Sequence, residues 1–272
     1  MAALKIESSS WWEVILLTIG GFLLFTILYS ACQSAAGNGP FGIAVTLGYV
    51  LGAVMVAAYA TLLWLFEGRR TSTLKLRQLP VQTAKGMAIG TLYLLSVTGM
   101  IALCGCYKIG EFSFYKDIWA QLSFFFLVAC GEEIMFRGIL FRLIDKRFGT
   151  VPALIISALI FGGTHILNPG ATMWSSAAIA IEAGLMLGIA YKCSGTLWMP
   201  IGIHWMWNFM EGPVLGFAVS GSDNADSLIK PLIQGPEFIT GGAFGAEASI
   251  IAASLGIAVS LLLWRAYRKV ER

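Results

Sequence analysis

Residues 118–141 read IWAQLSFFFLVACGEEIMFRGILF, an apolar run that contains Glu132, Glu133 and Arg137. A helix needs about 20 mostly apolar residues to cross a bilayer, and this run is long enough. Ionisable side chains at membrane depth cost roughly 2.5–3.5 kcal/mol each on insertion scales. The stretch therefore predicts both a membrane helix and a functional reason for three charges inside it.

The composition of the whole chain is typical of a membrane protein. Of its 272 residues, 57% are hydrophobic and only 12% are charged, and the mean hydropathy is +0.78. A soluble domain carries about 25% charged residues. The formal net charge of +3 is too small to indicate nucleic-acid binding. We therefore expect the lipid bilayer as a partner and no nucleic acid.

Hydrophobic segments of spanning length recur along the chain without a linker or repeat that would separate a second domain. We expect an all-α, polytopic membrane helix bundle of about eight transmembrane helices, formed by residues 1–272 as one integral membrane domain, with a polar site inside. The expected spans are Trp11–Ala31, Phe41–Phe66, Lys85–Tyr107, Ile118–Phe141, Val151–Leu167, Ala171–Tyr191, Thr196–Gly221 and Phe244–Trp264.

The positions of the basic residues predict the orientation of this bundle, because cytoplasmic loops are enriched in Lys and Arg. With both termini in the cytoplasm, the outer loops keep only Lys108, Lys116 and Lys230. A multi-pass protein of the cell membrane is therefore expected. The inner basic residues are Lys5, Arg69, Arg70, Lys75, Arg77, Lys85, Arg142, Lys146, Arg147, Lys192, Arg265, Arg268, Lys269 and Arg272.

Polar side chains also occur inside three other expected spans. Residues 161–165 read FGGTH and residues 204–208 read HWMWN, and these two stretches contain both histidines of the chain. The sixth span contains Glu182. At about 1.5 Å per residue from the inner ends, Glu132, Glu182 and His204 lie roughly 15 Å deep, and His165 roughly 20 Å. Four helices are therefore predicted to bring polar groups to one layer.

Spacing indicates which of these groups share a helix face. Glu133 and Arg137 are four residues apart and are predicted to pair. Glu132 is rotated by about 100° from its neighbour, so it points in a different direction. His204 and Asn208 are again four apart and project together. A buried ion pair that only joins helices, or a histidine that only bonds a neighbouring helix, could explain each group alone but not their shared depth.

The residue types favour peptide-bond hydrolysis without a covalent intermediate. A carboxylate near an imidazole suits activation of a water molecule, and a histidine followed by an asparagine four residues later suits donation to an oxyanion. No HExxH zinc motif is present. A zinc ion on the two histidines and Glu132 or Glu133 stays chemically possible. We expect no cofactor and no metal, because such a site would use up the base or leave Arg137 unpaired.

In these residues the chain resembles the CAAX-protease and bacteriocin-processing family, also called the Rce1-like or Abi family, and especially its bacterial members. The family shows three motifs in order on successive helices, and the core of the resemblance runs over residues 118–212. The motifs here are Glu132-Glu133-x-x-x-Arg137, Phe161-x-x-x-His165 and His204-x-x-x-Asn208.

The resemblance implies an intramembrane glutamic endopeptidase, historically labelled a metalloprotease, that cleaves membrane-associated peptides or proteins. It implies that Glu132 is the general base, assisted by His165, and that an oxyanion site is formed by His204 and Asn208. Glu133 and Arg137 would support the base. The family does not assign Glu182, which we expect as a possible cavity residue in its protonated form.

Two other functions remain open on the sequence. One is a non-catalytic membrane immunity or scaffold protein that binds a peptide or partner protein through the same polar groups. The other is a proton-coupled transporter, which is less favoured because no pair of broken helices is visible. The sequence does not select between CAAX-type cleavage and other peptide processing.

Overall fold

The computed structural model describes residues 11–37, 41–67, 72–223 and 226–270. Lys5, Arg69, Arg70 and Arg272, which contribute to the predicted orientation, lie outside these residues. The described chain is almost entirely helical, as expected. Its long helices are α1 (Trp11–Gly37), α2 (Phe41–Glu67), α3 (Leu79–Leu103), α4 (Ile118–Glu133), α6 (Thr150–Thr164), α7 (Met173–Ile179), α8 (Met186–Ser194), α9 (Trp198–Phe209) and α11 (Ile250–Val270).

Several helices join end to end into longer continuous segments, here called rods. Three rods contain a π-helical turn partway along. The π-helical turn η4 (Ile134–Phe141) continues α4 into α5 (Arg142–Phe148), and the turn η6 (Ala180–Leu185) joins α7 to α8. A third π-helical turn, η7 (Met210–Val214), extends α9. Such turns are rare and often occur at functional sites. Each of the three lies beside or contains a buried acidic residue.

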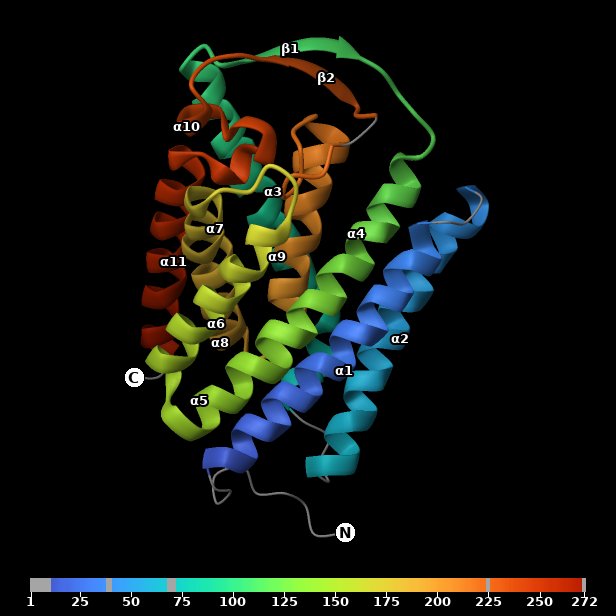
Figure 1. The fold of residues 1–272 in the computed structure, drawn as a ribbon, viewed down its shortest axis with the longest axis vertical. Coiled ribbons are helices and arrows are strands. Elements are labelled where there is room, and N and C mark those ends of the chain that lie inside the picture. The colour runs from blue at the N-terminus through green and yellow to red at the C-terminus, as the bar shows by residue number, and fades with distance from the viewer. Residues whose placement is uncertain (1–10, 38–40, 68–71, 224–225, 271–272) are drawn as a thin grey trace.

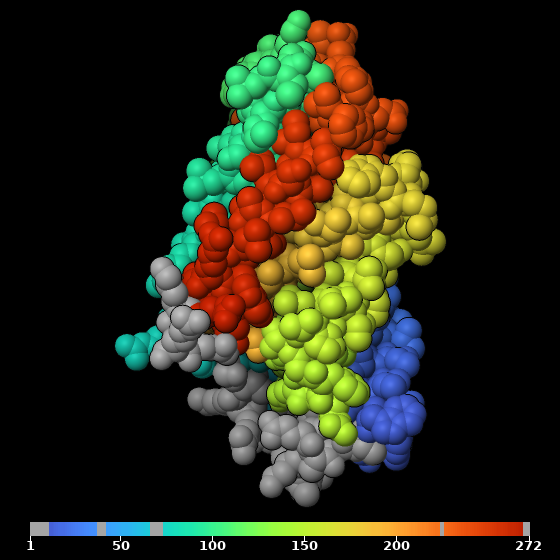
Figure 2. All heavy atoms as spheres, turned by 90° about the vertical axis from the view of Figure 1, so that its left-hand side faces the viewer, coloured from blue at the N-terminus to red at the C-terminus, as the bar shows by residue number. Residues whose placement is uncertain are grey.

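The rods form two slanted groups (Figure 1). The first group is α1, α2 and α4, and the second consists of α3, α6, α7–α8, α9 and α11. α1 begins and α11 ends toward the same end of the bundle. This is the arrangement that an even number of spans gives, although the cytoplasmic location of that end stays a prediction. In Figure 2, α11 lies on the surface between α3 and the α7–α8 rod.

Helix α9 is held in the interior by a close crossing with α3. A Cβ atom on Gly86 would lie 2.9 Å from the backbone nitrogen of Ile203, and one on Gly202 would lie 3.0 Å from that of Met87. Side chains at either glycine would therefore separate the two backbones. The crossing fixes the rod that carries His204 and Asn208.

Two segments differ from the sequence prediction. β1 (Tyr107–Phe112) and β2 (Ile229–Ile233) form an antiparallel ribbon with a register shift between Lys108 and Glu111. The ribbon covers one end of the bundle (Figure 1). The sequence predicted a span that ends at Tyr107, and no strand between the spans expected for Thr196–Gly221 and Phe244–Trp264. Long-range strand pairing decides both regions, and it leaves no periodic signal within either segment.

The expected number of eight spans is not confirmed. In the described part, six helices are long and apolar enough to cross a membrane: Trp11–Ala36, Gly42–Leu65, Leu76–Leu103, Thr150–Leu167, Met173–Ser194 and Ile250–Arg268. The other two expected spans are rods in the bundle as well. The α4 rod carries Glu132, Glu133 and Arg137 in its middle, and the α9 rod ends at Val214 and is mostly buried.

The remaining elements are short. The described chain before α3 forms two 3₁₀ turns, and it contacts the start of α9 because the backbone nitrogen of Leu197 donates to the carbonyl of Thr73. The short elements of the fold are η2 (Ser72–Leu74), η3 (Leu76–Gln78), η5 (His165–Leu167), α10 (Glu237–Thr240), η8 (Gly242–Phe244) and η9 (Ala246–Ala248).

Candidate active site

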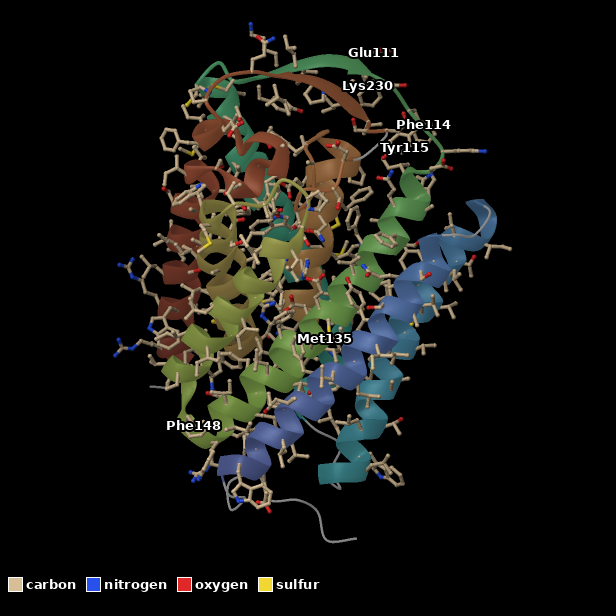
Figure 3. All side chains as sticks on the ribbon, viewed as in Figure 1. Glu111, Phe114, Tyr115, Met135, Phe148 and Lys230 are labelled. Carbon is tan, nitrogen blue, oxygen red and sulfur yellow. The ribbon has the colours of Figure 1, made fainter. Side chains whose placement is uncertain are left out.

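A cavity of about 790 Å³ lies where the two groups of rods meet. Its walls come from α1, α4, η4, the end of α6 with η5, α9, and the segment 219–223. Met135, which lines this cavity, lies about halfway along the molecule in Figure 3. The four residues expected to be catalytic all line it: Glu132, His165, His204 and Asn208. The structure thus brings together side chains from three separate motifs.

Glu133 lies on the closed side of α4, away from this cavity. Arg137 Nη1 donates to Glu133 Oε1 over 2.8 Å, and both side chains are 0% exposed. The pair expected from the four-residue spacing is present. The same oxygen lies 2.9 Å from His204 Nδ1. Because an ionised carboxylate only accepts hydrogen bonds, Nδ1 of His204 carries a proton.

Arg137 connects η4 to the π-helical turn η6. Its Nη2 donates to the carbonyl oxygens of Ala183 and Gly184 over 3.1 and 3.2 Å. Its guanidinium also lies over the ring of Phe161, 4.7 Å from the centroid. A cation over an aromatic face is attracted by the ring quadrupole. Arg137 is therefore held from three directions, and it in turn fixes Glu133.

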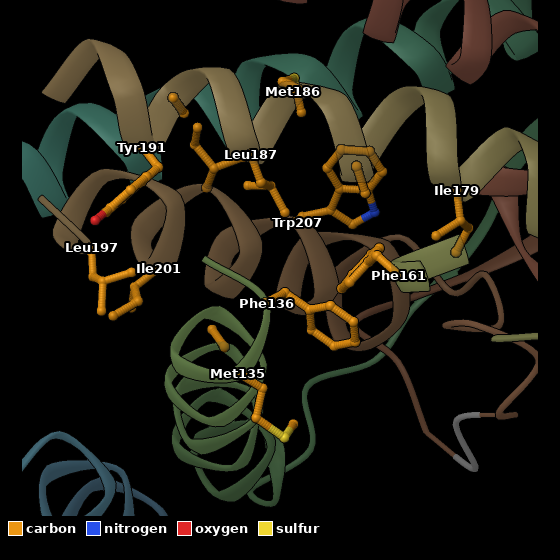
Figure 4. Close-up of a cluster of buried hydrophobic side chains, with 14 of the residues drawn as sticks. Met135, Phe136, Phe161, Ile179, Met186, Leu187, Tyr191, Leu197, Ile201 and Trp207 are labelled. Carbon is orange, nitrogen blue, oxygen red and sulfur yellow. The ribbon is translucent and has the colours of Figure 1, made fainter. Parts of the chain in front are cut away.

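Phe161 explains why an aromatic residue precedes the first histidine by one helical turn. Its ring centroid lies 4.8 Å from those of Phe136 and His165, and 6.2 Å from that of His204. Figure 4 shows the Phe136 and Phe161 rings adjacent in the apolar cluster. The ring therefore lies against the Arg137 guanidinium and beside both imidazoles.

Glu132 faces the cavity, and its side chain is 18% exposed. Oε1 accepts a hydrogen bond from Tyr29 of α1 over 3.0 Å. Oε2 faces His204 Nε2 at 3.8 Å, too far for a direct hydrogen bond. The two adjacent glutamates thus flank opposite nitrogens of one imidazole. Their different directions follow from the rotation of about 100° per residue.

His165 and Asn208 complete the cavity wall. His165 Nδ1 lies 2.7 Å from the carbonyl oxygen of Phe161. Because a carbonyl only accepts, this nitrogen carries the proton and leaves Nε2 as the acceptor of the neutral ring. No hydrogen bond joins His165 to Glu132 among the described contacts. Asn208 lines the same cavity, and no side-chain hydrogen bond within the described chain occupies its amide.

Glu182 lies apart from these residues. The sequence predicts it as a possible cavity residue, but it lines neither the large cavity nor the smaller one of about 20 Å³ behind it. Instead it is fully buried beside α3 and α11, where Tyr93 lies 2.9 Å from its Oε2. Equal depth in the membrane did not mean a shared site, because depth alone does not say which way a helix face points.

Two further buried acids were not predicted from the sequence. Glu211 accepts hydrogen bonds from Trp207 Nε1 over 3.2 Å and from the backbone nitrogen of Glu247 over 3.1 Å. Glu247 lines the smaller cavity with His165 and His204, and burial raises the pKa of its carboxyl. Glu211 continues the face of His204 and Asn208 at the next helical spacing, so a signal existed for it. Glu247, in a glycine-rich turn, offered none.

The side chains of the site include donor atoms of the kinds that bind metal ions. Within the described ranges, no group of three or more His, Cys, Asp or Glu side chains is arranged to hold a metal ion. The reason is visible at His204, whose Nδ1 is bonded to Glu133 and whose Nε2 faces Glu132. His165 uses its own Nδ1 on a backbone carbonyl.

Residues 114–210 match the family model described as Type II CAAX prenyl endopeptidase Rce1-like. The Rce1-like segment contains all three motifs, and the resemblance that they carry is confirmed. The match supports a protease, and with the six apolar helices it supports a multi-pass membrane protein. No curated protein and no solved structure matches the chain.

The Rce1-like segment does not account for the whole cavity. α1, which supplies Phe22, Thr26, Tyr29, Ser30 and Gln33 to its wall, lies outside the match. The same holds for Val219 to Asp223 on the opposite side. The site is therefore built from the matched segment together with flanking parts of the chain.

Proposed function

We propose that the protein is an intramembrane endopeptidase that hydrolyses peptide bonds with a water molecule activated by Glu132. One observation carries the proposal: Glu132, His165, His204 and Asn208 from three motifs line one cavity of about 790 Å³. Residues 118–212 are assigned as its catalytic core. The substrate is a membrane-associated peptide or protein segment, and the Rce1-like match favours a CAAX-type carboxyl terminus.

Glu132 is assigned as the general base through its Oε2 atom, because Oε1 already accepts from Tyr29. Water loses its proton to this oxygen as its own oxygen attacks the scissile carbonyl. The carbonyl carbon becomes tetrahedral and its oxygen becomes an oxyanion. The proton then passes to the leaving amide nitrogen as the carbon–nitrogen bond breaks, which leaves a carboxylic acid and an amine.

His204 and Asn208 are assigned to the oxyanion. His204 already carries a proton on Nδ1 for Glu133, so donation from Nε2 requires the doubly protonated imidazolium. With His204 in that form, its charge and that of Arg137 balance Glu132 and Glu133. Buried charges are stable only when they are paired in this way. The amide of Asn208 supplies the second donor.

His165 is assigned to proton transfer toward the leaving group. Its Nδ1 proton is held by Phe161, so Nε2 is the nitrogen that can take up and release a proton at the cavity. In this assignment His165 does not assist Glu132 directly. The imidazole that faces the base is that of His204, whose Nε2 lies 3.8 Å from Glu132 Oε2. Both histidines serve the same hydrolysis, and neither one needs to form a covalent bond with the substrate.

The test uses purified protein in lipid vesicles with a farnesylated CAAX peptide and its unprenylated form, and release of the carboxyl-terminal tripeptide is measured by mass spectrometry. Wild type is expected to cleave at least one of them. Glu132→Gln should lower the rate roughly 10²–10⁴-fold, because an amide does not accept the proton from water. Glu237→Gln, an exposed change in α10, is the matched control and should retain full activity.

A second arm searches for other substrates. Membrane peptides from cells with wild type are compared with those from cells with Glu132→Gln, so that cleaved segments appear only in the first. If neither arm yields a product that depends on Glu132, and the variant still binds peptide as wild type does, the protein is a scaffold and the protease proposal is wrong.

A further inference from the structure

Tyr29 of α1 is the one side chain outside the three motifs that bonds directly to the proposed base, among the described contacts. Its hydroxyl donates to Glu132 Oε1 over 3.0 Å, across 103 positions of sequence. The side chain is buried, with only 8% of the residue exposed, although most of α1 faces outward. A tyrosine hydroxyl on the inward face of this mostly exposed helix needs a hydrogen-bond partner, and the partner is Glu132.

A slot in α4 receives the ring of Tyr29. A Cβ atom on Gly131 would lie 2.7 Å from Tyr29 Cε2 and 3.0 Å from Cγ. Any side chain larger than hydrogen at position 131 would displace the ring, because Cβ atoms do not approach carbon that closely. Glycine next to the base therefore allows α1 to reach the site.

A second residue of α1 fixes the direction of the hydroxyl proton. Gln33 Nε2, one turn along the helix, donates to Tyr29 Oη over 2.8 Å. The tyrosine oxygen is thus an acceptor for Gln33, and its single proton is free for Glu132. Both residues line the large cavity. The order of donation runs from Gln33 to Tyr29 to Glu132, and it ends on an ionised carboxylate.

We propose that α1 completes the active site, and that Tyr29, seated against Gly131 and oriented by Gln33, is a positioning residue for the general base. By occupying Oε1 it directs Oε2 toward His204 and toward the substrate water. The proposal rests on the proposed function, since it takes Glu132 as the base. It assigns to the first helix a role in the reaction that the matched segment does not include.

The test is Tyr29→Phe, which keeps the ring in its slot and removes only the hydroxyl. Loss of a hydrogen bond to a charged group should lower kcat roughly 10- to 100-fold with little change in KM. The acid limb of the pH–rate profile should move to higher pH, because the proposed base loses a hydrogen-bond donor. Gln33→Leu should shift the profile in the same direction by less.

Tyr59→Phe is the matched control. Tyr59 is a fully buried tyrosine on α2 whose hydroxyl donates to the carbonyl of Gly138 over 2.6 Å, on the same rod as Glu132 but away from the cavity. It should lower the melting temperature without moving the pH–rate profile. If Tyr29→Phe behaves in the same way, the hydroxyl is structural and the proposal is wrong.

A second comparison tests the slot. Gly131→Ala should reduce kcat by displacing the ring, whereas the same change in a Tyr29→Ala background should cost little more, because the ring is already gone. Full additivity of the two losses would contradict the proposed contact. An active Glu132→Gln variant would refute the base itself. A dead Glu132→Gln variant beside a fully active Tyr29→Phe variant would refute only the role of Tyr29.

Discussion

Two tyrosine–glutamate pairs lie inside the described part of this protein, and they differ in the second partner of the tyrosine hydroxyl. In the pair Tyr29–Glu132, the second partner of the hydroxyl is a donor, Gln33, so the tyrosine proton goes to the carboxylate. In the pair Tyr93–Glu182, the second partner is an acceptor, the carbonyl oxygen of Ala252 at 2.6 Å. The hydroxyl of Tyr93 has only one proton to donate, and the carbonyl oxygen of Ala252 is the closer acceptor.

The contact between Tyr93 and Glu182, at 2.9 Å, then needs a proton from the carboxyl group itself. On this geometry we infer that Glu182 is a neutral acid that donates, whereas Glu132, the proposed base, accepts. No ion pair in the described chain involves Glu182, and burial of an unpaired charge is costly. The second partner of each tyrosine hydroxyl, a donor at Tyr29 and an acceptor at Tyr93, thus decides whether the glutamate accepts or donates the hydrogen bond.

The largest effect on stability is expected from Glu133→Gln, because the buried charges around Glu132 must balance one another. The change leaves Arg137 buried without its counter-charge, and breaking a buried pair costs about 3–5 kcal/mol. The melting temperature of the purified protein should fall, and activity should fall with it because His204 loses its carboxylate. Adding Arg137→Met should recover stability but not activity. Unchanged stability in Glu133→Gln would mean that the pair is not needed.

Tyr93→Phe should have an intermediate effect and should separate the two tyrosines. The change removes a hydroxyl that satisfies both Glu182 and the carbonyl of Ala252, so stability should fall by about 1–3 kcal/mol. The rate per folded molecule and the pH–rate profile should stay as in wild type, in contrast to Tyr29→Phe. A shifted profile in Tyr93→Phe would connect Glu182 to the reaction after all.

A small effect is expected from Glu182→Gln. If the carboxyl is neutral, an amide of the same shape can donate to Tyr93 in its place, and stability should change by less than about 1 kcal/mol. Glu182→Leu should cost more, because the tyrosine oxygen then lacks this partner. Activity per folded molecule should be unchanged in both variants. A large loss of stability in Glu182→Gln would show that the group is ionised.

No effect is expected from removal of metal ions. The balance of Glu132 and Glu133 against Arg137 and His204 needs no further cation. Treatment with a strong chelator should leave the rate unchanged, and elemental analysis should find far less than one metal ion per chain. Stoichiometric zinc, with activity lost on stripping and restored by zinc alone, would overturn the metal-free mechanism.

The sequence was sufficient for the parts of the site that depend on spacing along one helix. Glu133 and Arg137 pair at a spacing of four residues, and Glu132 and Glu133 point apart, as a rotation of about 100° per residue requires. The motifs also identified which rods meet. What spacing cannot give is contact between rods, so it missed Tyr29 and placed Glu182 at the cavity. The ribbon of β1 and β2 was missed for the same reason, since its strands pair across more than 100 residues.

The π-helical turns have a consequence for how this protein can change in evolution. A π-helical turn holds more residues than an α-helical turn, so it behaves as an insertion stored within a rod. Losing one residue between Glu133 and Arg137 would rotate Arg137 by about 100° relative to Glu133, away from the carbonyls of η6 that it now contacts. Insertions and deletions should therefore be tolerated in the outer loops, whereas the length of each polar rod is as much a part of the site as its side chains.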